Sequence, residues 1–295
     1  MVEFRDLEVI YWIVKLGGFR KAAARLNTTQ PAISNRITQI ERQYGISLFE
    51  RGRRKPVSPT ARGLTFFIHA EHMLRLHEAL IASLKETETL TGTVRLGVSE
   101  TLVQTWLSTL IRDLLQTHPG ITLDISVDIS TTLRDGLNRG ELDLAFMLEG
   151  LTPAKAVTLP LSDYPLEWVA SPDLPLGDGI LDLRHLVAWP ILTFSSRTQP
   201  YERIAALFKN PALGPVRLFG NGSLSSIVRL AVDGMGIGAI PPVIIREELA
   251  SGRLRILTTS VKLPTLSFAA TYLDGPGAGL AALVANRARE VAVSY

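Results

Sequence analysis

The stretch FRKAAARLNTTQPAISNRITQIE, residues 19–41, has the pattern of two short helices joined by a tight turn. In its second half Ile33, Ile37 and Ile40 recur at intervals of four and three residues, which makes one side of a helix apolar. Threonines that can cap this helix precede it, and a proline follows them, which is tolerated in a first turn because its missing N–H would have no partner there. The pattern predicts a helix–turn–helix whose second helix is buried along one side.

The opposite side of this second helix carries short or planar polar side chains rather than the Glu and Lys typical of an amphipathic surface helix. Such groups can hydrogen-bond to base edges and phosphates of DNA. We therefore predict a DNA recognition helix, and an ordinary pair of surface helices is the alternative. The expected DNA contacts on this helix are Thr29, Gln30, Pro31, Ser34, Asn35, Arg36 and Thr38.

A run of cations follows the predicted recognition helix. Four of the five residues 51–55 are Arg or Lys, and the fifth is a glycine. This arrangement is typical of a β-wing that lies along phosphates or in a minor groove, and a solvated charge run is the alternative. The expected DNA contacts here are Arg51, Arg53, Arg54 and Lys55.

Charge is unevenly distributed along the 295 residues. Residues 1–62 hold 12 Lys and Arg against 5 Asp and Glu, a net charge of +7, and the rest carries −4 because the whole chain is at +3. A basic segment on a neutral-to-acidic body is the electrostatic footprint of a DNA-binding head, and chance clustering of surface charge is the alternative.

The composition also excludes several classes of protein. The absence of cysteine excludes disulfides, thiolate zinc sites, a cysteine nucleophile and thiol-based redox sensing. No apolar stretch is long enough to span a membrane, and the first residues lack the charge and apolar run of a secretion signal. We therefore expect a cytoplasmic protein without a membrane partner.

Residues 60–88 contain no proline, and their one glycine lies in the first turn. Large apolar residues recur every seven residues, as in the a/d seam of a coiled coil, so we expect a long helix that pairs with a second copy of the chain. The expected dimerisation residues are Phe67, Leu74, Ile81 and Leu84. His69 and His72 are three residues apart on this helix, but no acidic residue completes a metal site, so we interpret them as interface histidines.

From residue 92 the pattern changes to short apolar strands that alternate with helices. Strands are expected at 94–98, 121–127, 142–148, 166–170, 191–194, 216–219, 237–240, 254–257 and 266–273, and helices at 103–117, 131–139, 201–208, 224–233 and 278–293. Such alternation favours α/β sheets with parallel neighbours. Two series of strands predict two doubly wound lobes with a ligand cleft between them.

A ligand of such lobes is bound by strand-to-helix turns, beside helix N-termini. The turns here carry clusters of hydroxyls and one arginine that could pair with a carboxylate, so we expect a small carboxylate effector; the alternative is that the Ser and Thr residues only cap their helices. For Glu100 we favour a solvent-facing side chain over a contact with an amine of the effector. The expected effector contacts are Ser99, Glu100, Thr101, Ser130, Thr131, Met147, Ser195, Ser196, Arg197, Asn221 and Ser223.

Two other classes of protein, an enzyme and a solute-binding protein, fit these patterns less well. For an enzyme, Gly234, Gly236 and Gly238 resemble the glycines of a dinucleotide loop, but they follow a predicted helix and precede a strand, the reverse of the order that a phosphate-binding loop needs. We therefore expect neither an enzyme nor a cofactor. A solute-binding protein would account for residues 92–295 but not for the basic head.

Several motifs together resemble the LysR-type transcriptional regulators, and the resemblance covers nearly the whole chain. The most specific lie in the head: Ala22-Ala23-Ala24-Arg25-Leu26, Thr29-Gln30-Pro31-Ala32-Ile33-Ser34, Leu48-Phe49-Glu50-Arg51 and Thr60-Ala61-Arg62-Gly63. Further segments similar to the family are 92–98, 140–145 and 232–241. Two residues depart from the family's common pattern: Asn35, where the family commonly has Arg, and Glu100, where a small or apolar residue is usual.

The resemblance implies an α+β multidomain chain with an N-terminal winged helix–turn–helix, a long linker helix and a C-terminal two-lobed α/β effector-binding domain of the periplasmic-binding-protein type. The expected domains are the DNA-binding domain 1–59, the linker (dimerisation) helix 60–91 and the effector-binding domain 92–295, with lobe I about 92–162 and 267–295 and lobe II about 163–266.

The implied function is sequence-specific transcription regulation controlled by a small-molecule effector. A solute-binding protein or a sensor without direct DNA readout is the alternative. The implied partners are double-stranded DNA at an inverted-repeat operator, the effector, RNA polymerase and further copies of the chain in a dimer or homotetramer.

Overall fold

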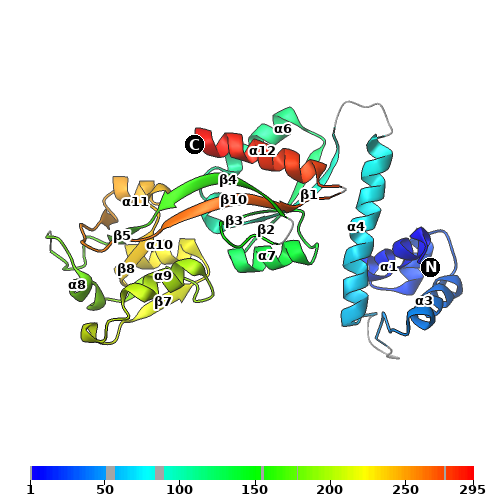
Figure 1. Ribbon diagram of the computed structural model, residues 1–295, viewed down its shortest axis with the longest axis horizontal. Helices are drawn as coiled ribbons and strands as arrows, with labels where there is room; N and C mark the ends of the chain where they lie inside the picture. Colours follow the sequence, from blue (N-terminus) through cyan, green and yellow to red (C-terminus); the bar gives the residue numbers. More distant parts are fainter. Residues whose placement is uncertain (1, 51–56, 84–89, 154–155, 178, 276) are drawn as a thin grey trace. The chain divides into compact units, whose positions relative to one another are not determined.

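The computed structural model describes residues 2–50, 57–83, 90–153, 156–177, 179–275 and 277–295. The chain divides into two compact units, the first built on residues 1–88 together with 139–141 and the second on residues 89–138 and 142–295 (Figure 1). Within the described ranges no helix is long and apolar enough to cross a membrane. A helical unit is thus followed by an α/β unit, which confirms the predicted fold class.

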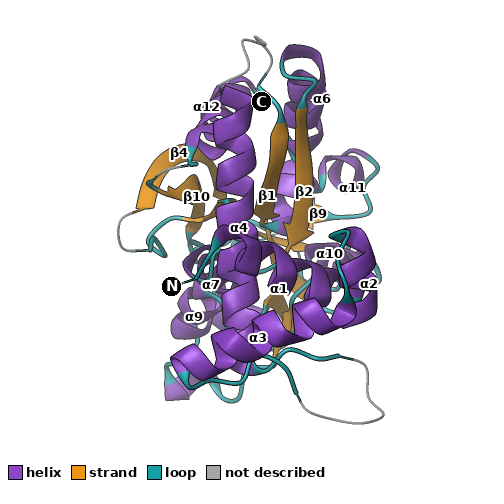
Figure 2. Cartoon of the chain, turned by 90° about the vertical axis from the view of Figure 1, so that its right-hand side faces the viewer, coloured by secondary structure: helices purple, strands orange, loops and turns teal. Residues whose placement is uncertain are grey.

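The first unit contains the helices α1 (Phe4–Leu16), α2 (Phe19–Arg25), α3 (Gln30–Tyr44) and α4 (Ala61–Ser83). α2 and α3 form the predicted helix–turn–helix, with α3 at the front of this unit in Figure 2. Ile33, Ile37 and Ile40 are buried in one apolar cluster with residues of α1 and α2. Thr29 caps α3, because its hydroxyl oxygen accepts the N–H of Ala32 at 3.3 Å. The apolar side and the cap of α3 are therefore as predicted.

The connection into α4 depends on a close backbone approach. The hydroxyl of Thr60 donates to the carbonyl of Ser47 at 2.6 Å and accepts the N–H of Gly63 at 3.0 Å. A Cβ atom on Gly63 would lie only 1.9 Å from the carbonyl oxygen of Leu48, so no other residue fits without a backbone shift. Glycine here lets the start of the long helix pack against the head.

The apolar stripe of α4 is only partly available to a second copy. The ring of Phe67 stacks on that of Tyr11 in α1, with 5.8 Å between the centroids. Phe67 thus has a partner in α1 of its own chain and is half-buried, and its contact with a second copy stays a prediction. Leu74 is half-buried and Ile81 exposed, whereas Leu84 lies outside the described residues.

The described residues of the second unit form two five-stranded sheets. The first has the order β2 (Ile121–Val127), β1 (Gly92–Val98), β3 (Leu144–Leu148), β10 (Thr265–Leu273) and β4 (Ala156–Pro165). The second has the order β7 (Leu218–Asn221), β6 (Ile191–Phe194), β8 (Ile237–Ile240), β5 (Glu167–Ala170) and β9 (Arg255–Ile256). We call the parts of this unit around the two sheets lobe I and lobe II.

The prediction of parallel neighbours holds for half of each sheet. β1 pairs in parallel with β2 and β3, and β6 with β7 and β8. β10 runs antiparallel to β3 and β4, and β5 runs antiparallel to β8 and β9, so both sheets are mixed. The chain leaves lobe I after β4 and returns to it with β10. The strand that runs against its parallel neighbours is β10 in the first sheet and β5 in the second, and each lies next to one of these crossings.

Strand β4 is missing from the sequence prediction because its residues include Pro160 and Pro165. Proline cannot donate to a ladder, which makes such a segment look like a loop. In the structure β4 is an edge strand whose register against β10 shifts between Phe268 and Ala269, opposite Pro160. Edge position and bulge together accommodate the proline.

The helices of the second unit are α5 (Glu100–Val103), α6 (Leu107–Thr117), α7 (Ser130–Asn138), α8 (Leu183–Val187), α9 (Gln199–Leu207), α10 (Leu224–Val232), α11 (Arg246–Ala250) and α12 (Gly279–Ser294). The single helix expected at 103–117 is broken into α5 and α6. Between them the hydroxyl of Thr105 donates to the carbonyls of Thr101 and Leu102, and the side chain of Trp106 is fully buried.

The glycines between α10 and β8 have structural roles. A Cβ atom on Gly236 would lie 2.3 Å from the carbonyl oxygen of Pro190, so the chain needs glycine for a close backbone approach. The observed order is helix, glycines, strand, as expected from the sequence. A phosphate-binding loop requires the reverse order.

Candidate functional site

The solvent side of α3 is the candidate DNA-contacting surface. Gln30, Pro31 and Asn35 are exposed on it, whereas Ser34 and Thr38 are half-buried. The hydroxyl of Thr38 donates to the carbonyl of Ser34 at 2.9 Å, so its proton is used within the helix and its lone pairs stay free to accept. The face therefore offers amides and hydroxyls, the groups that read base edges.

Arg36 has partners other than those expected of a DNA contact. One nitrogen of its guanidinium lies 3.1 Å from a carboxylate oxygen of Glu3, and another lies 3.0 Å from one of Asp6. Asp6 is only 5% exposed, and its other oxygen accepts the backbone N–H of Glu3 at 2.7 Å. Arg36 thus ties α3 to the start of α1.

Only the base of the predicted wing is described. Phe49 forms an antiparallel bridge with Pro59, and the N–H of Glu50 donates to the carbonyl of Ser58 at 2.9 Å. The expected wing contacts lie outside the described residues: Arg51, Arg53, Arg54 and Lys55.

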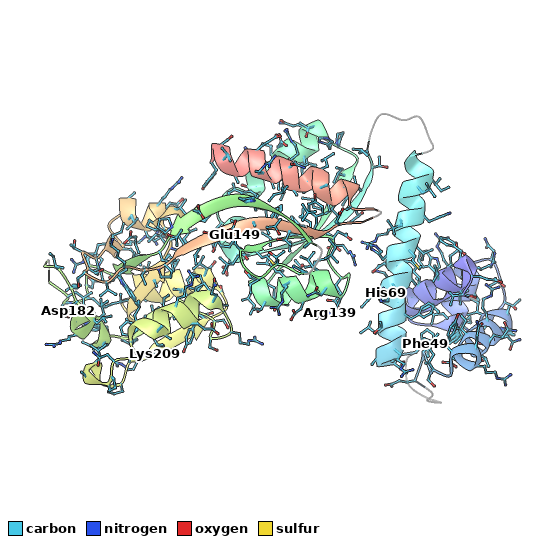
Figure 3. All side chains as sticks on the ribbon, viewed as in Figure 1. Phe49, His69, Arg139, Glu149, Asp182 and Lys209 are labelled. Carbon is cyan, nitrogen blue, oxygen red and sulfur yellow. The ribbon has the colours of Figure 1, made fainter. Side chains whose placement is uncertain are left out.

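A cavity of about 310 Å³ lies in the second unit, walled by the turns that follow β1, β2, β6 and β7. These turns belong to both lobes, so the cavity lies where a ligand cleft is predicted. Figure 3 shows the side chains of this unit, with Glu149 labelled in the turn after β3. The expected effector contacts that line the cavity are Ser99, Glu100, Thr101, Ser130, Thr131, Ser195, Arg197 and Asn221.

Three expected effector contacts do not line this cavity. Met147 is 1% exposed and packs in a small apolar cluster with α7, and the next residue of β3, Leu148, lines the cavity instead. The prediction that Met147 contacts the effector is therefore wrong, because successive side chains of a strand point to opposite faces of the sheet. Ser196 is exposed outside the cavity wall. Ser223 caps α10 by accepting the N–H of Ser226 at 3.4 Å.

Several cavity residues were missed from the sequence. Asp128 lies in the same turn as Ser130, and Thr198 in the turn of Arg197, so both could have been found by extending the turns by two residues. Leu266 gave no signal, because it lies on the crossing strand β10, which no local pattern places beside the cavity. The apolar side chains of the described wall are Val127, Ile129, Leu148, Leu151, Phe194, Pro200, Leu224, Leu266 and Phe268.

Two buried hydroxyls connect the turns at the cavity wall. The Oγ atoms of Ser99 and Ser130 lie 3.3 Å apart, and the Oγ of Ser130 accepts the N–H of Leu148 at 3.1 Å. This chain joins the ends of β1 and β3 to the start of α7. Ser99 and Ser130 therefore have structural roles in addition to lining the cavity.

Among the described residues, three charged side chains line the cavity: Glu100, Asp128 and Arg197. Asp128 is exposed and accepts the N–H of Ile129 at 2.7 Å. Arg197 is exposed in the turn after β6, and no ion pair joins it to another of the described residues. Arg197 is thus the positive group of the described wall and is available to an anion.

Glu100 fits neither of the two interpretations made from the sequence. Its carboxylate is half-buried and is held by the first turn of α10 in lobe II: Oε2 accepts the N–H of Leu224 at 2.6 Å, and Oε1 accepts the N–H of Ser225 at 3.0 Å. Burial works to raise the pKa of Glu100, but these hydrogen bonds, that from Leu224 first, hold the pKa below its ordinary value. The carboxylate is therefore ionised and already bound.

Comparison with known proteins places these two sites in a family context. A family model described as "Bacterial regulatory helix-turn-helix protein, lysR family" matches residues 4–64, and one described as "LysR substrate binding domain" matches residues 87–289. The candidate DNA-contacting surface lies within the first match and the cavity within the second.

Similar proteins differ in how much of the chain they cover. The HTH-type transcriptional regulator YtlI of Bacillus subtilis (strain 168) is 37% identical over 147 residues, which cover 49% of this chain and 46% of that protein. The HTH-type transcriptional regulator CfxR of Cupriavidus necator is 27% identical over 86% of this chain and 80% of its own length. The solved structure of ArgP from Mycobacterium tuberculosis has a TM-score of 0.77 at 22% identity, covering 99% of this chain and 98% of its own, which is a likeness of fold.

Proposed function

Because this chain belongs to the LysR family of transcriptional regulators, we propose that it binds an operator through α3 and responds to a small carboxylate in its interlobe cavity. The family consists of DNA-binding transcription regulators with an effector-binding domain. What we propose for this chain in particular is the set of operator contacts, the class of effector and the domain boundaries.

The DNA-binding part of the proposal rests on the solvent side of α3. Gln30, Ser34, Asn35 and Thr38 present amides and hydroxyls there, which suits direct readout of bases. We drop Arg36 from the base-contacting set, because two carboxylates of α1 engage its guanidinium. Thr29 and Pro31 stay in the set as residues of the helix start, where N–H groups face phosphates. The basic run at 51–55 supplies further phosphate contacts.

The observation that carries the effector part is the position of Arg197. Its guanidinium lies in the wall of a cavity of about 310 Å³, large enough for a small organic molecule, and no ion pair joins it to another described residue. Hydroxyls from Thr101, Thr131 and Ser195 line the same wall and can complete the binding of a carboxylate. The apolar side chains of the wall suit a hydrocarbon body. We propose that the molecule is bound and released without chemical change.

The proposed division of the chain is the DNA-binding domain 1–59, the linker 60–91, which contains α4, and the effector-binding domain 92–295. We propose that the linker helix pairs with that of a second copy, as in a dimer on an inverted repeat, with homotetramers formed from dimers. Met73 is 52% exposed on α4 and joins Leu74 and Ile81 as a candidate contact in place of Phe67. The cytoplasm, where DNA is accessible, is the proposed place of action.

The test combines DNA selection with ligand screening. The full chain is incubated with a random duplex library, and bound sequences are recovered; enrichment of an inverted repeat is expected. A thermal-shift screen of small carboxylates, amines and amino acids then identifies the ligand class. Wild type is compared with Arg197→Ala and with Arg112→Ala, a matched loss of an exposed arginine on α6. A chain that binds ligand but retards no duplex would instead be a solute-binding protein or sensor.

A further inference from the structure

The carboxylate of Glu100 connects the two lobes. Glu100 opens α5 directly after β1 in lobe I, whereas Leu224 and Ser225 open α10 after β7 in lobe II. Besides the two backbone N–H groups, the hydroxyl of Ser225 donates to Oε1 of Glu100 at 2.8 Å, and that of Ser223 donates to it at 3.4 Å. Four donors from one helix start thus converge on one carboxylate of the other lobe.

The first turn of α10 is saturated by these contacts. Ser223 accepts the N–H of Ser226, while Glu100 accepts the N–H groups of Leu224 and Ser225. A helix of this length carries a partial positive charge at its N-terminus, so the carboxylate is held by the helix dipole as well as by hydrogen bonds. Glu100 therefore takes the place that a bound anion occupies at other helix N-termini.

A second side chain of lobe I supports the same contact. Gln104 lies one helical turn beyond Glu100, and its Nε2 donates to the Oγ of Ser225 at 2.6 Å and to Oε1 of Glu100 at 3.3 Å. The amide thus keeps the carboxylate and the Ser225 hydroxyl in one network. Glu100 and Leu224 both line the cavity, so the network forms part of its wall.

We propose that Glu100 is a built-in anion that binds the N-terminus of α10, joins lobe I to lobe II and reserves this position against the acid group of a ligand. The consequence for specificity rests on the proposed effector function. An acidic ligand is directed to Arg197, and a molecule with two acid groups finds the second anion position already filled. Glu100 thus determines specificity because its carboxylate fills the anion position at the N-terminus of α10 and excludes an acid group of the ligand from it.

The proposal is tested by replacing the internal carboxylate with a free one. Glu100→Ala leaves the donors of Leu224 and Ser225 facing a space that acetate can enter. The variant is made in full-length protein that also carries Arg197→Ala, so that acetate bound at Arg197 does not contribute. We expect a lower melting temperature than in the Arg197→Ala parent, and a saturable recovery of about 2–4 °C with acetate but not with acetamide or chloride at equal ionic strength.

Matched controls make this result specific. Glu167→Ala removes an exposed glutamate of β5 in the same parent and should show no more response to acetate than the parent itself. Equal acetate responses in Glu100→Ala, Glu167→Ala and the parent would overturn the proposal. So would a Glu100→Ala variant that melts at the parent's temperature.

A double-mutant cycle provides a second route if Glu100→Ala does not fold. Ser225→Pro removes both the N–H and the hydroxyl of residue 225, and proline is tolerated in the first turn of a helix. Combined with Glu100→Gln, it should lower the melting temperature by less than the sum of the single effects, since both changes remove the same contact. Additive effects would contradict the proposal. Neither experiment uses DNA or an effector, so failure of the proposed function would leave both results unchanged.

Discussion

At the scale of single residues, the two polar neighbours Asn35 and Arg36 in α3 are expected to behave in opposite ways. Asn35 is exposed, so Asn35→Ala should leave the free energy of unfolding within about 0.5 kcal/mol of wild type. It should weaken operator binding by about 1–3 kcal/mol through loss of base contacts. Arg36→Ala removes the partner of the buried Asp6 carboxylate and should lower the free energy of unfolding by about 1–3 kcal/mol.

Chemical denaturation and gel retardation measure the two effects. Arg36→Lys serves as a control, because it keeps the charge but not the paired geometry with Glu3 and Asp6. Equal stability of Arg36→Ala and wild type, together with a large loss of operator affinity, would return Arg36 to the set of DNA contacts.

The Glu100 carboxylate gives a pH dependence with a definite sign. Burial raises its pKa, but the hydrogen bonds from Leu224 and Ser225 outweigh burial and place the pKa below the ordinary 4.5. The ionised form is therefore favoured by folding, so its stabilisation is fully present above pH 4.5 and is lost as the pH falls through the lowered pKa. Wild type should exceed Glu100→Gln in melting temperature at neutral pH, and this difference should shrink in acid. Asp128 and Arg197 are the other charged residues of the described cavity wall. Both are present in wild type and in Glu100→Gln, so the difference between the two proteins reports on Glu100. A difference that is constant with pH would contradict the assignment.

The site residues that could be predicted are those whose role follows from a local pattern. Ser99, Ser130 and Asn221 lie where strands end or the following helices begin, and the alternation of strands and helices is readable from the sequence. Met147 was predicted wrongly because a strand prediction without a known sheet does not say which face is buried. The contact of Glu100 with Leu224 joins residues 124 positions apart, so no local pattern could reveal it.

At the scale of elements, the start of α4 gives a prediction in which two effects oppose each other. Glycine to alanine in a helix normally stabilises by about 1 kcal/mol. At Gly63 the added Cβ would lie 1.9 Å from the carbonyl oxygen of Leu48, so Gly63→Ala should instead destabilise the head by about 1–3 kcal/mol. Gly279→Ala in α12, where nothing lies within 4 Å of the new atom, is the control and should be neutral or stabilising. Thermal denaturation followed by circular dichroism decides between them. Equal effects at both positions would show that the backbone at Gly63 adjusts freely.

The two sides of α4 should separate stability from assembly. Phe67 stacks on Tyr11 of the same chain, so Phe67→Ala should lower the melting temperature without dissociating the oligomer. Met73 is 52% exposed, so Met73→Asp should dissociate dimers, because like charges would meet across a two-fold axis, with little change in the fold of a single chain. Light scattering over a concentration series measures the oligomer. If Phe67→Ala dissociated the oligomer and Met73→Asp did not, the interface would instead include Phe67, as the sequence predicts.

At the scale of the whole molecule, the sequence was sufficient for the order of the parts but not for the connection between the lobes. Helix caps, a seven-residue period and strand–helix alternation are local signals, and each of them places one element. The crossing strands β4 and β10 pair over their whole length, although about 100 residues separate them, and two prolines conceal β4. Long-range pairing of this kind depends on the complete sheet, so both the mixed sheets and the cavity residues of β10 emerge only from the structure.

Coupling between cavity and operator is the last prediction and follows from thermodynamic linkage. If a carboxylate changes operator affinity by some factor, operator DNA must change the affinity for that carboxylate by the same factor. Arg197→Ala should weaken carboxylate binding by about 1–3 kcal/mol. This is the magnitude of a charge-assisted hydrogen bond in a site that water reaches, because Arg197 is exposed. Operator affinity without ligand should be unchanged, because the substitution leaves α3 intact. Isothermal titration with and without operator, and gel retardation with and without ligand, measure the two factors. Unequal factors in wild type would mean that the ligand acts at more than one site, whereas unchanged carboxylate affinity in Arg197→Ala would place the anion elsewhere in the cavity.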